Sequence, residues 1–194
     1  KENTNTFMSY TYTDAEGIIS GNDLSRHNLS LRVNTDLSSK LSMDAKVNYI
    51  REDFGNKLQQ GENYDNPYRY GYLTPRNIRT EDIAHYEFIN AEGKNTQHHW
   101  IPQFNGAGNP YWVRENVLNP VLEERVTGLV SLKYQITDDL SIMGRSALDR
   151  QNGYSEFSRK NDTYTRARFG SYEKNFSYGS EWNSDVLVNF NKDF

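Results

Sequence analysis

Residues 28–49 read NLSLRVNTDLSSKLSMDAKVNY, and this stretch decides the fold class. Over residues 28–34, Leu29, Leu31 and Val33 alternate with polar residues, and residues 41–49 repeat the alternation. A period of two is typical of β-strands, because successive side chains of a strand point to opposite faces. Since only a short polar segment separates the two runs, they predict a β-hairpin with one apolar and one polar face.

A second hairpin is predicted over residues 125–149, with Leu129 as the one exception to its alternation. The sequence of the second hairpin is similar to that of the first, since Leu140-Ser-Ile-Met-Gly-Arg145 matches Leu41-Ser-Met-Asp-Ala-Lys46. Such internal repetition indicates that one architectural unit is used twice. Residues 4–13, which lead into a turn at 14–17, and residues 182–190, which alternate in the same way, flank the hairpins, so we expect six strands.

Composition excludes several classes of protein. The 194 residues carry a formal net charge of −4, which argues against a nucleic-acid partner bound through a broad basic surface. The chain has no cysteine, so disulfides, thiol nucleophiles and cysteine-bound metals are excluded. It also has no apolar run approaching the roughly 18 residues of a membrane-spanning helix. Alternating strands could still span a membrane, and the mean hydropathy of −0.91 counts little against them.

Long and short connections alternate between the predicted strands. Residues 51–119 and 151–179 form polar connections, whereas the hairpin turns are short. Outer-membrane barrels have short turns on one side, long loops outside, and strands that are apolar outward and polar inward. Aromatic residues near the strand ends fit such a barrel; they are Tyr10, Tyr12, Tyr49, Tyr134 and Trp182. We therefore predict an all-β, antiparallel up-and-down segment of about six strands of a transmembrane β-barrel with long extracellular loops. The alternative is a soluble β-sandwich whose polar face meets solvent.

Four sequence segments resemble segments of a known protein family. They are Tyr10-Thr-Tyr-Thr-Asp-Ala-Glu-Gly-Ile-Ile19, Arg26-His-Asn-Leu-Ser-Leu-Arg32, Asn109-Pro-Tyr-Trp112 and Leu140-Ser-Ile-Met-Gly-Arg-Ser-Ala-Leu-Asp149. In their order and spacing they resemble the barrel of SusC/RagA-like TonB-dependent outer-membrane transporters of Bacteroidetes. The resemblance is strongest in the strands and weakest in residues 151–179. The family's plug and TonB box have no counterpart here, and six strands are far fewer than the roughly 22 of such transporters.

The resemblance implies that residues 1–194 are an internal segment of such a barrel, with residues 51–119 as an extracellular loop. It further implies a non-enzymatic nutrient importer of glycan fragments or peptides, without a cofactor. The implied partners are a SusD-like surface lipoprotein, TonB acting through the plug, the remaining barrel strands and outer-membrane lipid. A soluble β-sandwich carbohydrate-binding module stands as the alternative, and a β-rich hydrolase ranks third.

Three aromatic residues of the long connection are the predicted binding residues for the substrate or for the SusD-like lipoprotein, which serves the family as an outer lid. Trp100, Tyr111 and Trp112 lie near Gly and Pro residues, and exposed rings there could stack on sugars or anchor a protein partner. The alternative is that these rings pack inside the loop, because large loops often build a small core of their own.

Other candidate chemistry is weaker. His98 and His99 match no helical metal motif, so we expect solvated loop histidines and no metal site. The Asp and Glu residues show no sequence arrangement that defines a catalytic pair. The glycines at 106 and 108 indicate a turn, as do the repeated Asn-Pro-Tyr phrases at 66–68 and 109–111. Thr80 is expected to cap a short helix that ends near Tyr86.

Overall fold

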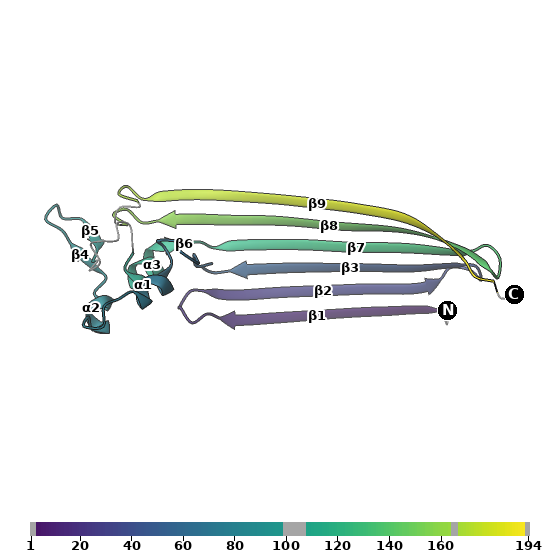
Figure 1. The fold of residues 1–194 in the computed structure, drawn as a ribbon, viewed down its shortest axis with the longest axis horizontal. Helices are drawn as coiled ribbons and strands as arrows, with labels where there is room; N and C mark the ends of the chain where they lie inside the picture. The colour runs from purple at the N-terminus through teal and green to yellow at the C-terminus, as the bar shows by residue number, and fades with distance from the viewer. Residues whose placement is uncertain (1–2, 99–107, 164–166, 193–194) are drawn as a thin grey trace.

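Six long antiparallel strands form one sheet, in the spatial order β1-β2-β3-β7-β8-β9 (Figure 1). The structure, a computed structural model, describes residues 3–98, 108–163 and 167–192. The long strands are β1 (Thr4–Glu16), β2 (Asp23–Asp36), β3 (Leu41–Phe54), β7 (Val121–Gln135), β8 (Leu140–Arg159) and β9 (Ser171–Phe190). A short strand, β6 (Val117–Leu118), pairs with β8 beyond the end of β7. This arrangement confirms the prediction of an all-β, up-and-down segment.

Two turns of four residues each, 37–40 and 136–139, close the hairpins. Both lie at one end of the sheet, which we call the turn end (Figure 1). In the first, the backbone N–H groups of Leu37 and Ser38 donate to the carbonyl of Leu41 at 2.8 and 3.1 Å. In the second, Ile136 and Thr137 donate in the same way to Leu140, at 2.9 and 3.1 Å. The two hairpins therefore share a turn geometry as well as a sequence pattern, as the internal repeat predicted.

The opposite end, the loop end, carries the long connections (Figure 1). The connection between β3 and β7 contains α1 (Pro67–Tyr72), α2 (Thr80–Ala84), the β4–β5 hairpin (Glu87–Ile89 and Asn95–Gln97), α3 (Pro110–Asn116) and β6. One expectation was wrong: residues 151–179 are not a single polar connection. Strand β8 continues to Arg159 and β9 starts at Ser171. Both faces of these extensions carry polar residues, so hydrophobic alternation could not reveal them.

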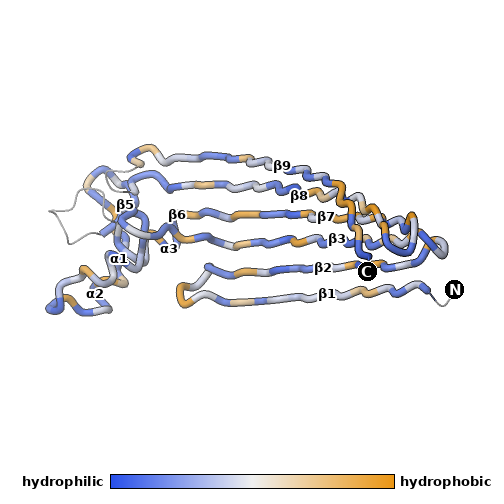
Figure 2. Tube along the Cα trace, turned by 45° about the vertical axis from the view of Figure 1, so that its right-hand side comes forward, coloured by the Kyte–Doolittle hydropathy of each residue, from blue (hydrophilic) through white to orange (hydrophobic). Residues whose placement is uncertain are grey.

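The registers of the ladders separate apolar from charged side chains. Leu31 lies opposite Val47, and Ala45 lies opposite Val130, on what we call the apolar face. Because side chains alternate along each strand, the predicted set shares this face: Leu29, Leu31, Val33, Met43, Ala45 and Val47. Arg32, Asp44 and Lys46 lie on the opposite, charged face. Figure 2 shows the resulting alternation of hydrophobic and hydrophilic positions along the strands.

The apolar face is not covered by another layer within the described part of the chain. Val186 and Val188 of β9 are 70% and 68% exposed, and Val47 in the middle of the sheet is 49% exposed. The buried apolar side chains lie at the loop end and outside the long strands; they are Tyr70, Trp112, Val113, Val117 and Ala167. No described helix is long and apolar enough to cross a membrane.

The two faces predict different environments for neighbouring residues of β2. We expect a spin label at Leu31→Cys to collide more often with lipid-soluble oxygen than one at Arg32→Cys, when the intact protein is reconstituted in lipid. A one-residue register slip would move every charge to the apolar face, at a cost of about 2–4 kcal/mol for each Arg or Lys at the bilayer midplane. Equal access at both positions would contradict a membrane-facing apolar side.

Candidate functional site

The loop end holds a folded group of segments that we call the loop cluster: residues 56–98, 108–120 and 160–170, as far as the structure describes them. Its helices α1 and α3 begin in the same way. The side chain of Asn66 accepts from the backbone N–H groups of Tyr68 and Arg69, and that of Asn109 accepts from Tyr111. A proline follows each asparagine at the first helical position, where its missing N–H costs nothing. The Asn-Pro-Tyr phrases are therefore helix starts, and the expectation of turns was wrong.

Asn109 also joins separate parts of the loop cluster. Its side-chain Nδ2 donates to the carbonyls of Ile83 and His98, at 2.9 and 3.1 Å. Its backbone N–H donates to Oε1 of Gln97 at 3.0 Å. The residue is fully buried, so each of these bonds offsets a desolvation cost. One asparagine thus fixes α3 against α2 and against the β4–β5 hairpin.

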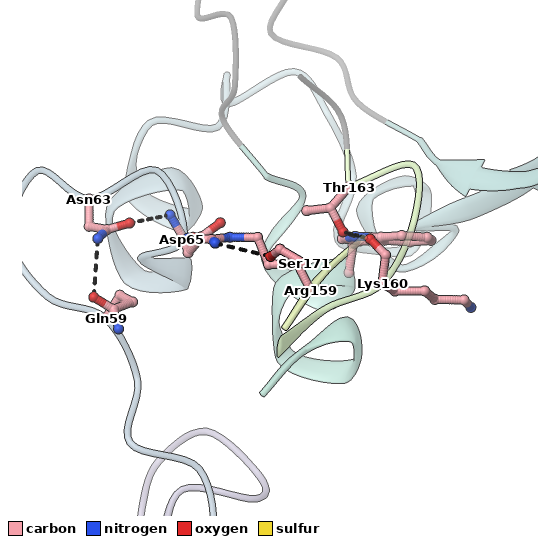
Figure 3. Close-up of polar contacts among 8 residues, drawn as sticks. Gln59, Asn63, Asp65, Arg159, Lys160, Thr163 and Ser171 are labelled. Atoms are coloured by element: carbon pink, nitrogen blue, oxygen red, sulfur yellow. Dashed lines mark hydrogen bonds and ion pairs between the residues drawn. The ribbon is translucent and has the colours of Figure 1, made fainter. Parts of the chain in front are cut away.

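A buried ion pair ties the loop cluster to the sheet (Figure 3). Arg159, the last residue of β8, donates from Nε and Nη2 to Oδ2 of Asp65, at 2.9 and 2.6 Å. The Asp65 side chain is 1% exposed and the Arg159 side chain 18%. Asn63 accepts from the backbone N–H of Asp65 at 2.9 Å, and the guanidinium lies over the ring of Phe157. This pair holds the segment before α1 against the end of β8.

Trp112 lies inside the loop cluster with no exposed surface. Its indole Nε1 donates to the hydroxyl of Thr163 at 3.2 Å, and the Lys160 ammonium lies 5.2 Å from the ring centroid. Both partners belong to the β8–β9 connection, which therefore packs on α3. Because a fully buried ring has no surface for a ligand, its placement favours the loop-packing alternative over direct binding by Trp112.

The other two predicted binding residues have different positions. Tyr111 is partly exposed, with the guanidinium of Arg114 5.3 Å from its ring centroid. It remains a predicted binding residue. Trp100 lies outside the described residues, so the structure does not place it.

The remaining polar groups of the long connection are arranged as structural contacts. Arg79 donates two hydrogen bonds to Asp82, at 2.9 and 3.0 Å, and these bonds lower the pKa of that carboxyl. Arg79, rather than Thr80, is the N-cap residue of α2, and it makes no side-chain capping bond. Nδ1 of His98 lies 3.0 Å from the carbonyl of His85. No described group of three or more His, Cys, Asp or Glu residues could hold a metal ion.

A groove of about 550 Å³ lies on the charged face next to the loop cluster. Neighbouring strands supply its wall, since Arg26 lies opposite Glu52, and Glu52 lies opposite Glu123. Gln151 of β8 and Ser177 of β9 extend the lining across the sheet. Arg26 and Glu52 are 3.3 Å apart, and Lys57 lies 2.9 Å from Glu123. The groove therefore offers paired charges and amide or hydroxyl groups, a surface suited to hydrogen bonding with a polar ligand.

The groove was missed by sequence reasoning. Its residues come from five strands and are far apart in the sequence. The available signal was that polar residues occupy every second position of the strands near the loop end, as at Arg26, Glu52 and Gln151. That signal fixes the face of each residue but not the concavity.

Comparisons with known proteins show the fold and no closer kinship. No family model matches the chain, and no curated protein matches it. Among solved structures, the chain is similar to one described as the RagAB peptide importer in the "closed-closed" state, with a TM-score of 0.68 and 10% sequence identity. The match covers 99% of this chain and 21% of that chain. This chain therefore has the strand arrangement of about one fifth of an importer chain.

The buried ion pair makes a testable contribution to the loop cluster. We expect Asp65→Asn to lower the local unfolding free energy of α1 by about 3 kcal/mol, because it leaves the Arg159 cation largely buried without its carboxylate. Hydrogen–deuterium exchange of the α1 amides in the intact protein measures this effect. Asp82→Asn is the matched control, because Asp82 belongs to an exposed pair, and it should change the exchange little. Equal exchange in the two variants would contradict the anchoring role of Asp65.

Proposed function

We propose that this chain is a segment of the barrel wall of a SusC/RagA-like, TonB-dependent outer-membrane importer. The apolar face of the sheet meets lipid, the charged face lines the lumen, and the loop cluster lies at the extracellular mouth. The importer takes up peptides or glycan fragments, works with a SusD-like surface lipoprotein and is energised by TonB through a plug. It catalyses no chemical reaction of its own.

The observation that carries this proposal is the uncovered apolar face of a single-layer sheet. A soluble sandwich buries this face against a second sheet, about 10 Å away. In the described residues, the only other sheet is the β4–β5 hairpin, which lies in the loop cluster. Large contiguous apolar surfaces on a protein mark contact with a partner or a membrane. The alternative of a soluble carbohydrate-binding module is therefore not favoured.

The arrangement of charges supports the same proposal. Ion pairs cross the charged face between neighbouring strands; they are Arg32–Asp44, Arg125–Asp149 and Arg145–Asp185. Polar and charged residues on the inner face are typical of barrels with a water-filled or plugged lumen. The position of the long connections at one end, opposite the short turns, also fits an outer-membrane barrel.

The groove on the charged face is the proposed substrate contact. In the proposed barrel it faces the lumen just below the loop cluster, where an entering molecule meets the wall first. Its paired carboxylate and guanidinium groups match the hydrogen-bonding groups of peptides, and its amide and hydroxyl groups also suit glycans. The likeness to a peptide importer is limited to the fold, and it supports the peptide class only as a proposal.

The orientation can be tested on intact cells. An irregular polar backbone is not tolerated in contact with hydrocarbon, and outer-membrane barrels carry their long loops on the extracellular side. We therefore expect the part of residues 51–119 that follows β3, which ends at Phe54, to lie outside the cell. Protease added to cells that lack the lipoprotein lid should cut within this connection, at sites mapped by mass spectrometry. Cleavage that requires rupture of the outer membrane would contradict the proposed orientation. The periplasmic side of the same protein serves as the control, since the turns at 37–40 and 136–139 should be protected in intact cells.

Two aromatic substitutions separate ligand binding from loop packing. If Tyr111 is a binding hot spot, Tyr111→Ala should weaken binding of the lipoprotein or of the imported substrate by about 2 kcal/mol, or roughly thirtyfold, with α3 exchange unchanged. Trp112→Ala should instead loosen the loop cluster, because large-to-small core changes of this kind cost about 3–5 kcal/mol. Titration with each partner and hydrogen–deuterium exchange of both variants provide the two readouts. Unchanged affinity for both partners in Tyr111→Ala would remove this residue from the binding site.

A further inference from the structure

Arg150 of β8 carries a charge on the apolar face. It lies opposite Val126 of β7 and Ser180 of β9, in the same alternation as Leu148. Its side chain is exposed, and its guanidinium lies 5.2 Å from the ring centroid of Tyr178. An arginine at this place needs an explanation, because the proposed function turns this face toward lipid.

Arg150 differs from the other arginines of the six long strands. Each of the others has a carboxylate within ion-pair distance, and the pairs are Arg26–Glu52, Arg32–Asp44, Arg51–Glu124, Arg125–Asp149, Arg145–Asp185 and Arg159–Asp65. Arg150 has no carboxylate partner among the described residues. The nearest acidic position on its face is Glu124, which accepts a hydrogen bond from Tyr49 at 2.6 Å and lies 3.5 Å from Arg51. Among the described residues, Arg150 is therefore the arginine of the long strands whose charge is not balanced by a carboxylate.

The height of Arg150 along the strand places it at the border of the apolar band. On the apolar face, the next pair of residues toward the turn end is Leu148 and Trp182. The next pair toward the loop end is Asn152 and Tyr178. Ten residues separate Arg150 from Leu140, which is about 33 Å along a strand and about 25 Å along the membrane normal at a tilt of about 40°. An apolar band about 25 Å tall that begins at Leu140, the first residue of β8, would end at the level of Arg150.

Given the proposed function, we propose that Arg150 and Tyr178 form a binding site for the phosphate of an outer-leaflet lipid headgroup. The loop end faces outward in that proposal, so this row lies at the level of the outer leaflet headgroups. A guanidinium pairs with phosphate through parallel hydrogen bonds. Tyr178 holds the guanidinium in place from one side and adds an aromatic ring suited to the membrane interface. The acyl chains of the same lipid would lie along Leu148, Val126 and Trp182.

A lipid is favoured over free phosphate by the surroundings of Arg150. The proposed phosphate site consists of one cation, Arg150, and one aromatic ring, Tyr178. Inorganic phosphate bound there would remain exposed to water. A lipid adds apolar contacts below the same row, which supply affinity that a free anion cannot gain. The experiment therefore compares lipids that differ only in phosphate, with inorganic phosphate as a competitor.

The test uses the intact membrane protein that carries this chain, purified in detergent and mixed with diphosphoryl lipid A or its dephosphorylated form. Native mass spectrometry measures the fraction of protein that retains lipid. We expect Arg150→Gln to reduce retention of the phosphorylated form about fivefold, since one basic residue near an anionic headgroup contributes about 1 kcal/mol. The matched control is Arg145→Gln, on the same strand but on the charged face, which should retain lipid as the unsubstituted protein does. Arg150→Lys should keep part of the preference.

The outcomes distinguish failure of the lipid site from failure of the proposed function. Equal retention of phosphorylated lipid by Arg150→Gln and the unsubstituted protein would overturn the lipid site, as would full displacement by millimolar inorganic phosphate. A spin label at Val186→Cys, on the apolar face of β9, tests the membrane contact separately. If that label is accessible to lipid-soluble oxygen while Arg150→Gln has no effect, the barrel proposal stands and the lipid site is wrong. If the label lies in water, both proposals fail.

Discussion

The register of the antiparallel ladders is the constraint on which the rest of the structure depends. Because a strand places successive side chains on opposite faces, a shift of one residue in any ladder would exchange an apolar row for a charged one. The short turns at 37–40 and 136–139 fix two of these registers directly. The ladder between β3 and β7 joins the two hairpins, and Ala45 lies opposite Val130 there. Consistent register across it gives six strands one apolar and one charged face.

This constraint divides the stabilising interactions of the chain between two regions. The long strands are held by their backbone ladders and by ion pairs across the charged face, and they contribute no fully buried apolar side chain in the described residues. The loop cluster has a small core of its own around Tyr70 and Trp112. The long strands therefore leave an apolar face exposed, whereas the loop cluster buries apolar side chains of its own. This division explains how a chain of low mean hydropathy can carry a sheet with one apolar face, since the other face and the loops are polar.

Sequence periodicity predicted the sheet where one face is apolar and failed where both faces are polar. The hairpin faces followed from alternation alone, but the extensions of β8 to Arg159 and β9 from Ser171 lack that signal. The helix starts at Asn66 and Asn109 could have been predicted, because an asparagine followed by proline is a common N-cap pair. The burial of Trp112 was foreseen only as the loop-packing alternative, and its partner Thr163 could not be predicted, since that residue belongs to a distant connection. The groove likewise depends on five strands at once.

The ion pair between Asp65 and Arg159 connects these two regions at one strand. Strand β8 carries Arg159 at the loop end, Arg145 on the charged face and Arg150 on the apolar face. Since a β-strand in a continuous ladder is stiff, displacement of the segment before α1 has to break the buried pair or move the end of β8. Breaking a buried pair costs about 3–5 kcal/mol, so thermal motion alone seldom separates them. A displacement of the loop cluster would therefore reach the groove through β8, because Gln151 of the same strand lines it.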